Sequence, residues 1–253
     1  MMSEASAQID QFGPRAAAYV GSAVHAQGAD LARMTQAIAD LSPERLLDIG
    51  TGGGHVAYAA SPHAREVVAA DPSPLMLLAV EAQCRQRRLT NVITARTTAE
   101  ALPFADARFD AVASRFSAHH WASLAQGLAQ ARRVCQPGAL ALFADVIAPA
   151  QPQCDTHLQA VELLRDPSHG RDYTLAEWTA ALAQAGFAIT ALHPARLPME
   201  FASWTARMET PPALAAAIRS LQQDAPACVR EHFSIQADGS FTIDTVLIEA
   251  RAI

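Results

Sequence analysis

The sequence contains no lysine: all 19 of the basic residues among its 253 positions are arginine. Schiff-base chemistry, covalent attachment of pyridoxal phosphate and the phosphate-binding lysine of a P-loop each require a lysine amine. The absence of lysine therefore excludes these three kinds of site.

Other features are scarce too. No run of eighteen apolar residues occurs, and residues 1–15 lack the basic and apolar regions of a signal peptide. The four cysteines form no C-x-x-C pair, so we expect reduced structural thiols and no metal site. A net charge of −6 without a basic block argues against nucleic acid as a partner. We expect a soluble cytoplasmic protein that acts on a small molecule, without a membrane partner, and with homodimerisation left open.

Continuous apolar runs recur along the chain and are typical of parallel strands buried on both faces. They cover residues 45–49, 66–70, 92–95, 109–114 and 139–146. Alternating with helical patterns, they predict an α/β fold: a doubly wound, Rossmann-like, mostly parallel seven-stranded sheet with helices on both faces. The segment after Gly239 predicts an antiparallel C-terminal strand that pairs with residues 187–192.

The chain length favours one domain, residues 1–253. Residues 1–44 are expected to form a helical cap over the open end of the sheet. Residues 45–150 would form the cofactor-binding half. Residues 151–253 would form the substrate-side half with the C-terminal hairpin.

The expected helices carry start and stop signals. Ser73 is a suitable N-cap with Pro74 in the first helical position, and Thr174 with Glu177 forms a capping box in a helix that ends at Gly186. The apolar face predicted for the first of these helices consists of Leu75, Leu78, Ala79 and Ala82.

The stretch "LLDIGTGGGH", residues 46–55, joins a strand that ends at Ile49 to a helix through a glycine loop. Ligands of open α/β sheets bind at this carboxyl end of a parallel strand. Gly50, Gly52 and Gly54 permit positive φ and close approach of a ligand to backbone N–H groups. A ligand-free turn would not need four glycines in five positions, so a binding loop is the favoured interpretation.

Three positions narrow the identity of the ligand. The dinucleotide pattern G-x-G-x-x-G is broken by His55, and by Ala57 when counted from Gly52. Asp48, inside the end of the strand, suits a cationic ligand better than a pyrophosphate, either directly or through backbone groups that it orders. Asp71 ends the next strand, where an acid accepts hydrogen bonds from ribose hydroxyls. A cation, a ribose and no diphosphate together describe S-adenosylmethionine.

With these motifs the sequence resembles the class I S-adenosylmethionine-dependent methyltransferases, in particular the ubiquinone and menaquinone biosynthesis (methyltransferase type 11) branch. The resemblance covers about residues 12–193. It rests on "LLDIGTGGGH", "VVAADPSPLML", "TTAEALPFADARFDAV" and "SRFSAHHW" taken together, because any one of them alone would be weak.

The resemblance implies which residues hold the cofactor. Gly50 to Gly52 would approach its amino-acid end with Asp48 beneath, and Asp71 would hold the ribose. The other positions would line the adenine pocket, lie below the sulfonium or close over the cofactor. The full implied set is Tyr19, His25, Asp48, Gly50, Thr51, Gly52, Asp71, Pro72, Met76, Ala99, Glu100, Ser114 and Arg115.

Methyl transfer from a sulfonium is an in-line displacement that requires no protein nucleophile or metal. A base is needed only if the acceptor loses a proton. Adjacent residues on a helix diverge by about 100°, so we expect at most one of His119 and His120 to face the site, and His119 is the candidate base. An equal alternative makes both histidines ordinary residues at the start of a helix that Pro137–Gly138 ends.

Residues 164–174 are a candidate substrate-covering segment, in which His169 and Arg171 could bind an acidic or carbonyl acceptor. A polar surface turn is the favoured alternative for this segment. Trp178 and Trp204 are expected in the core, not on a substrate platform.

The place where nucleic-acid methyltransferases carry N/D-P-P-Y reads "SRFS", residues 114–117, so we expect a small-molecule acceptor. The alternative is a protein that binds S-adenosylmethionine or S-adenosylhomocysteine without turnover. A nicotinamide dehydrogenase ranks third because its glycine fingerprint is broken.

Overall fold

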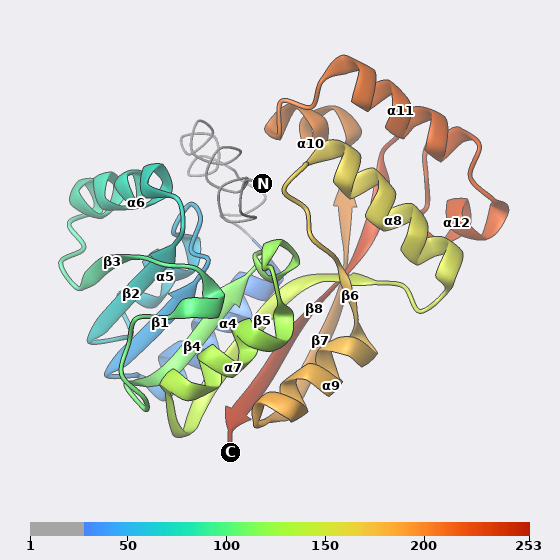
Figure 1. Cartoon of the computed structure of the whole chain (residues 1–253). Helices are drawn as coiled ribbons and strands as arrows, with labels where there is room; N and C mark the ends of the chain where they lie inside the picture. The colour runs from blue at the N-terminus through green and yellow to red at the C-terminus, as the bar shows by residue number, and fades with distance from the viewer. Residues whose placement is uncertain (1–27) are drawn as a thin grey trace.

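The computed structural model describes residues 28–253, so Tyr19 and His25 lie outside the described residues. The strands are β1 (Arg45–Ile49), β2 (Glu66–Asp71), β3 (Val92–Arg96), β4 (Phe109–Arg115), β5 (Cys135–Ala148), β6 (Tyr173–Thr174), β7 (Phe187–Met199) and β8 (Phe241–Ala252). They form one sheet in the order β3-β2-β1-β4-β5-β8-β7, and β6 pairs with β5 beside this path (Figure 1).

The directions of the strands agree with the sequence-based expectation. β1 to β5 run parallel, whereas β8 lies antiparallel between β5 and β7. The predicted fold class is therefore confirmed. Within residues 28–253 the sheet has eight strands and not seven, because the two-residue β6 pairs with the end of β5.

Helices cover both faces of the sheet. They are α4 (Ala29–Leu41), α5 (His55–Ala60), α6 (Pro74–Arg87), α7 (Leu124–Val134), α8 (Pro152–Arg165), α9 (Leu175–Ala185), α10 (Phe201–Arg207), α11 (Pro212–Gln223) and α12 (Ala227–His232), with the 3-10 turns η2 (Ala99–Ala101) and η3 (Ala118–His120). Successive strand residues point to opposite faces: Leu46 packs with α4, α5 and α6, and Leu47 packs with α7 and α9.

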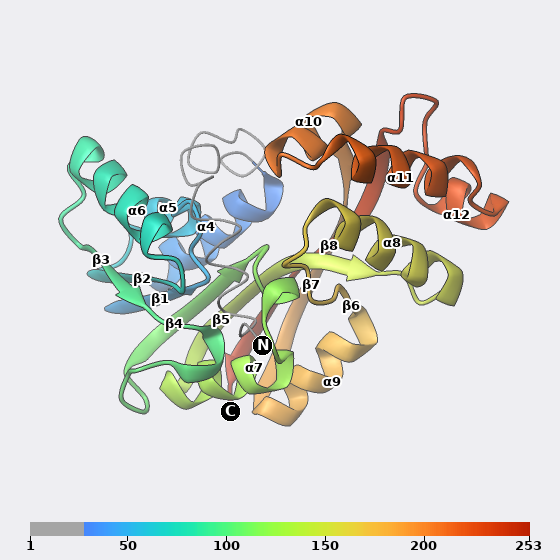
Figure 2. The ribbon, with the colours of Figure 1, turned by 45° about the horizontal axis from the view of Figure 1, so that its top comes forward.

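A third core cluster lies beyond the sheet proper. α8, α10, α11 and α12 gather on one side, over the ends of β5, β7 and β8 (Figure 2). Trp204 and Phe233 are buried at the centre of this cluster. Within the described residues, no helix is long and apolar enough to cross a membrane.

Two predictions about helices were wrong. In α6 the buried side chains are Met76, Leu77, Val80 and Cys84, whereas Leu75 and Leu78 are 47% and 56% exposed. Both stripes of this helix are apolar, so hydrophobicity did not distinguish the core-facing one. The helix after β4 ends at Val134, and Pro137–Gly138 lie inside β5, where a register shift opposite residues 109–111 tolerates a residue without an N–H.

The described part of the expected N-terminal cap is α4, which lies on a face of the sheet and not over its open end. Leu31, Met34 and Ile38 follow helical spacing and pack with Leu46 in the core. The burial of this apolar stripe explains its position.

The capping box of α9 generates a stability prediction. Thr174 Oγ1 accepts from the Glu177 N–H at 3.2 Å, and the Glu177 carboxylate accepts from the Thr174 N–H at 2.7 Å. Thr174→Ala should lower the free energy of unfolding by about 1 kcal/mol in urea denaturation. The matched control is Thr179→Ala in the middle of the same helix, which should leave stability unchanged or slightly raised. Equal losses in both variants would contradict the capping role.

Candidate active site

A cavity opens at the carboxyl ends of the parallel strands and encloses about 1300 Å³, including its open mouth. Its walls include residues that directly follow β1, β2, β3 and β4, together with residues of α8, β7 and β8. Because the carboxyl ends of parallel strands meet at one edge, residues far apart in the sequence converge here.

Eight of the predicted site residues line this cavity: the implied cofactor residues Gly50, Gly52, Asp71, Pro72, Met76, Ala99 and Glu100, and the candidate base His119. Four other predicted residues are sequence neighbours of cavity residues but do not line the cavity themselves: Asp48, Thr51, Ser114 and Arg115. The structure thus brings together most of the predicted set, and the individual roles stay predictions.

The glycine loop takes a conformation that favours glycine. Gly50 and Gly52 have φ values of +70° and +50°. A Cβ atom at Gly50 would lie 1.8 Å from Ser117 Oγ, so this glycine permits close packing against the segment after β4. A Cβ atom at Gly52 would meet nothing within 4 Å, and Gly52 lines the cavity. The loop therefore leaves room for a ligand against its backbone.

Asp71 ends β2 and holds the loop in place. Its Oδ2 accepts from the Gly52 N–H at 2.9 Å, and its Oδ1 accepts from the Ser73 N–H at 2.9 Å. Burial raises its pKa to about 6, although the two backbone hydrogen bonds act in the opposite direction. A carboxylate has about four acceptor positions, so Asp71 retains acceptor capacity toward the cavity that it lines.

Asp48 acts on the loop from below. Its carboxylate accepts from Thr51 Oγ1 at 2.6 Å, and burial raises its pKa to about 7. Because Asp48 does not line the cavity, direct contact with a cationic ligand is not supported, whereas ordering of the loop is. Arg115, expected below the sulfonium, does not line the cavity and pairs through two guanidinium nitrogens with Asp30 of α4.

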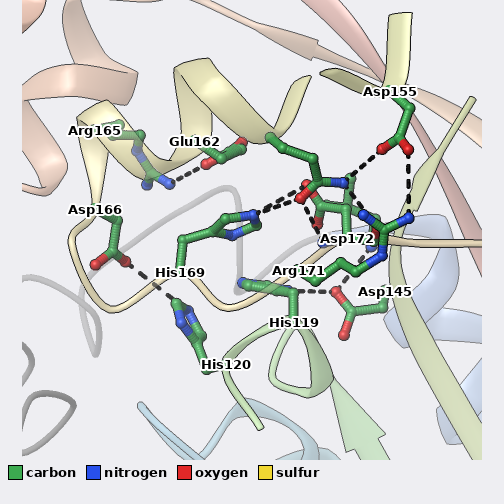
Figure 3. Close-up of polar contacts among 12 residues, drawn as sticks. His119, His120, Asp145, Asp155, Glu162, Arg165, Asp166, His169, Arg171 and Asp172 are labelled. Carbon is green, nitrogen blue, oxygen red and sulfur yellow. Dashed lines mark hydrogen bonds and ion pairs between the residues drawn. The ribbon is translucent and has the colours of Figure 1, made fainter. Parts of the chain in front are cut away.

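The opposite end of the cavity is polar (Figure 3). His119 Nδ1 lies 2.6 Å from Asp145 Oδ1, and Asp145 near the end of β5 is 2% exposed. Burial alone would lower the pKa of His119, but the attraction and hydrogen bond of Asp145 outweigh it and raise this pKa to about 9. The same contact keeps the pKa of Asp145 below its usual value despite burial.

His120 also lines the cavity, so the expectation that only one of the two histidines faces it was wrong. The reason is that both sit in the short turn η3 and not in α7, which begins at Leu124 after the Ser123 N-cap. Their ring centroids are 4.2 Å apart. Burial and the charge of His119 lower the pKa of His120 to about 4.

The segment 166–172 is not the surface turn that was favoured from the sequence. Asp166, His169 and Asp172 are all buried. His169 Nε2 lies 3.0 Å from Gln159 Oε1, and Arg171 pairs with Asp155 and Glu177. Neither His169 nor Arg171 lines the cavity, so their proposed contact with an acceptor is not supported.

The two tryptophans differ in their relation to the cavity. Trp178 is buried in the core beside Phe143, as expected. Trp204 is also fully buried, but it lines the cavity as well. Trp204 is therefore both a core residue and part of the cavity wall.

Sequence reasoning missed several cavity residues. Thr97 and Thr98 follow β3 directly and could have been found by extending the strand-end rule. Glu162 and Arg165, an ion pair at 3.1 Å, gave no such signal because they lie in the last turn of α8 and not directly after a strand. No group of three His, Cys, Asp or Glu side chains in the described residues could hold a metal ion.

A parallel sheet with a glycine loop after β1 and an acid at the end of β2 defines a Rossmann-like nucleotide-binding protein. The residues present fit S-adenosylmethionine: the backbone at Gly52 faces open space, and Asp71 offers a carboxylate. Residues 47–143 match the family model described as a methyltransferase domain.

Individual relatives extend this match. The chain is 42% identical over 202 residues to the uncharacterized protein YafE of Escherichia coli, and this match covers 80% of this chain and 98% of YafE. It is 33% identical over 200 residues to the uncharacterized methyltransferase YcgJ of Bacillus subtilis, and that match covers 79% of each chain. The crystal structure of YcgJ has a TM-score of 0.85 at 30% identity, covering 88% of this chain and 97% of YcgJ.

A shorter match is to the demethylmenaquinone methyltransferase of Thermus thermophilus, 36% identical over 116 residues, or 44% of this chain and 52% of that protein. The chain belongs to the S-adenosylmethionine-dependent methyltransferase family, in the branch predicted from its motifs. S-adenosylmethionine is its cofactor.

The open space at Gly52 generates a binding prediction. Gly52→Ala should weaken S-adenosylhomocysteine binding by about tenfold or more, or about 1.4 kcal/mol, because the added methyl occupies space beside the loop backbone. Gly138→Ala is a matched control: φ is +79°, the Cβ atom is equally unobstructed, and Gly138 does not line the cavity. Calorimetry should find wild-type affinity in that control. Equal affinity of the two variants would show that the space at Gly52 is not used.

Proposed function

We propose that the protein transfers the methyl group of S-adenosylmethionine to a small molecule that binds in the same cavity as the cofactor. The observation that carries this proposal is the continuity of the cavity, which reaches from Gly52 and Asp71 to His119 and Trp204. Donor and acceptor could thus meet without leaving the protein, and alignment of the two is the main requirement of the reaction.

The acceptor side of the cavity has two kinds of wall. One is apolar and consists of Phe116, Val146, Leu197, Met199, Trp204 and Ile243. The other is the polar end with His119, His120 and Arg165. An acceptor with an apolar body and one polar group fits both walls. The net charge of −6 and the enclosed position of the cavity support a small molecule over a nucleic acid.

The cofactor side is assigned as follows in this proposal. Gly50 and Gly52 approach the amino-acid end, and Asp71 binds the ribose. Pro72, Met76, Ala99 and Glu100 border the adenine ring. Asp48 and Thr51 hold the loop in shape from below through their 2.6 Å hydrogen bond. Residues 45–150 would thus supply the cofactor half, and residues 151–253 much of the acceptor side.

The bound cofactor supplies an electrophilic methyl group on a sulfonium. The contribution of the chain is to place the acceptor in line with that methyl group and to exclude water. Ser117 and Trp121, joined by a 3.1 Å hydrogen bond, and Met199 would form the wall of the cavity where the two subsites meet.

Turnover distinguishes this proposal from cofactor binding alone. The full-length protein would be incubated with S-adenosylmethionine labelled in the methyl group and a small-molecule extract, and products would be separated by mass. Label in an extract component, absent without protein, is the expected result. Tight binding of S-adenosylhomocysteine with no label transfer would favour a non-catalytic binding protein.

The proposed role of Asp71 predicts non-additive effects on binding. Asp71→Asn should weaken S-adenosylhomocysteine by about 1–3 kcal/mol, through lost ribose hydrogen bonds and altered loop contacts. The 2′,3′-dideoxy analogue of S-adenosylhomocysteine separates these two causes. It should bind the wild type weakly, and its affinity should fall little further in Asp71→Asn. Fully additive losses in calorimetry would mean that Asp71 does not contact the ribose.

The pKa of Asp71 predicts how this binding depends on pH. Because burial raises that pKa to about 6, the carboxylate that accepts ribose hydrogen bonds exists above pH 6 and is lost below it. Affinity for S-adenosylhomocysteine should therefore be constant above about pH 7 and fall by up to about tenfold per unit below pH 6. In Asp71→Asn this fall should disappear.

A further inference from the structure

We infer that the methyl acceptor loses a proton from an oxygen atom during transfer and that His119, positioned by Asp145, receives it. This inference rests on the proposed function and adds to it the class of the acceptor: a phenol or enol on an apolar body.

Asp145 is held as a carboxylate by three donors. Its Oδ1 accepts from the Val146 N–H at 2.8 Å and lies 2.6 Å from His119 Nδ1, and its Oδ2 accepts from the Ala118 N–H at 2.8 Å. An ionised carboxylate only accepts hydrogen bonds, so the proton between the two side chains sits on Nδ1 of His119. Nε2 is then the nitrogen that can take or give a proton.

His119 is fixed from its backbone side as well. Its carbonyl oxygen accepts from the Gly170 N–H at 2.9 Å and from the Arg171 N–H at 3.0 Å. A Cβ atom at Gly170 would lie 3.0 Å from this oxygen, so glycine permits the close approach. The imidazole is therefore held in one orientation at the cavity wall before any acceptor binds, as a proton-transfer group should be.

The charged and titratable groups around His119 come from several elements. They are Asp145 on β5, Glu162 on α8, Asp172 in the segment 166–172, and the rings of His120 and His169. Burial lowers the pKa of His119, but the charge and hydrogen bond of Asp145 outweigh it and raise the pKa to about 9. Burial raises the pKa of Asp172 above its usual value, and the charge of His119 acts in the opposite direction.

The position of His119 at the cavity wall indicates which acceptors benefit from it. A base helps an acceptor whose reacting atom must lose a proton, as the O–H of a phenol or enol does. A carboxylic acid is already ionised at neutral pH and needs no base. A neutral amine can attack through its lone pair before it loses a proton. The arrangement therefore favours a phenol or enol.

The step balances as follows. The acceptor O–H bond breaks and its proton passes to Nε2 of His119, so a positive charge appears on the imidazole next to the Asp145 carboxylate. The new oxygen–methyl bond forms as the sulfur–methyl bond breaks, and that electron pair stays on sulfur. The products are the methyl ether and S-adenosylhomocysteine, and the imidazolium later releases its proton to water.

His120 does not fit this role. Its Nδ1 lies 3.1 Å from the Ser168 carbonyl oxygen, an acceptor, so Nδ1 carries the proton. Its pKa of about 4, lowered by burial and by His119, is far from that of a phenol. Its remaining nitrogen faces Asp166, with 3.9 Å between Nε2 and Oδ2. His120 is therefore a neutral neighbour in the cavity and a weak base.

The first test follows the imidazole nitrogens by NMR in the full-length protein and needs no acceptor. His119 should titrate near pH 9, and in its neutral form only Nδ1 should be protonated. In Asp145→Asn its pKa should fall below 6.5, because the burial effect remains and the carboxylate is gone. A neutral His119 protonated at Nε2, or an unchanged pKa in Asp145→Asn, would overturn the inference.

The chain supplies a matched control for this test. His193 and Glu249 form another histidine–carboxylate pair, 2.7 Å apart, on β7 and β8, and neither lines the cavity. Glu249→Gln removes the carboxylate of this pair and should leave the titration of His119 unchanged.

The second test uses the acceptor obtained by label transfer. The methyl group should be on oxygen, His119→Gln should lower kcat about a hundredfold or more, and affinity for S-adenosylhomocysteine should stay within about twofold. Below pH 9 the wild-type kcat should increase about tenfold for each unit by which the pH is raised, because only neutral His119 accepts a proton. Asp145→Asn should move this increase to lower pH and lower the constant kcat reached above it. His193→Gln should leave both the pH profile and the highest kcat unchanged.

The outcomes separate the two proposals. Methylation on nitrogen, carbon or sulfur, or a pH profile that Asp145→Asn does not move, overturns the role of His119 while the methyltransferase proposal stands. No label transfer to any acceptor overturns both proposals, although S-adenosylhomocysteine would still bind.

Discussion

Two buried carboxylates hold the cavity open at the edge of the sheet. Asp71 ends β2 and accepts from the N–H of Gly52, in the loop after the neighbouring strand β1. Asp145 lies near the end of β5 and accepts from the N–H of Ala118, in the turn after the neighbouring strand β4. In each case an acid on one strand orients the loop that follows the next strand, and each oriented loop forms a wall of the cavity. The cost of burying these charges is offset by backbone donors that would otherwise lack partners.

The segment 166–172 shows how the polar end is closed. Its backbone donates to the carbonyl oxygen of His119, and its Ser168 carbonyl faces His120. Asp166 turns back to accept from the Ser168 N–H and hydroxyl at 2.9 and 2.7 Å. A connection that reads as a polar turn in the sequence is thus part of the buried framework of the site.

The cofactor side was largely predictable because its signals are local. Five apolar runs, the glycine loop and the acids at strand ends are each visible within a few residues, and seven implied cofactor positions line the cavity. The acceptor side could not be predicted in this way, because its contacts join segments that are distant in the sequence. Asp145 stands visibly in an apolar run, yet nothing in the sequence links it to His119, 26 residues earlier. The face of α6 and the bulged start of β5 were missed because tertiary packing decided them.

The position of β8 inside the sheet has a consequence for the order of folding. β7 pairs only with β8 in the described sheet, and β8 joins it to β5 through pairs such as Leu140 with Arg251. Residues 28–148 can therefore pair their strands during synthesis, whereas β7 has no sheet partner until β8 has been made. Contacts over such sequence separations form slowly. Since Leu197, Met199 and Ile243 belong to these two strands, a nascent chain acquires its cofactor wall first and its acceptor wall last.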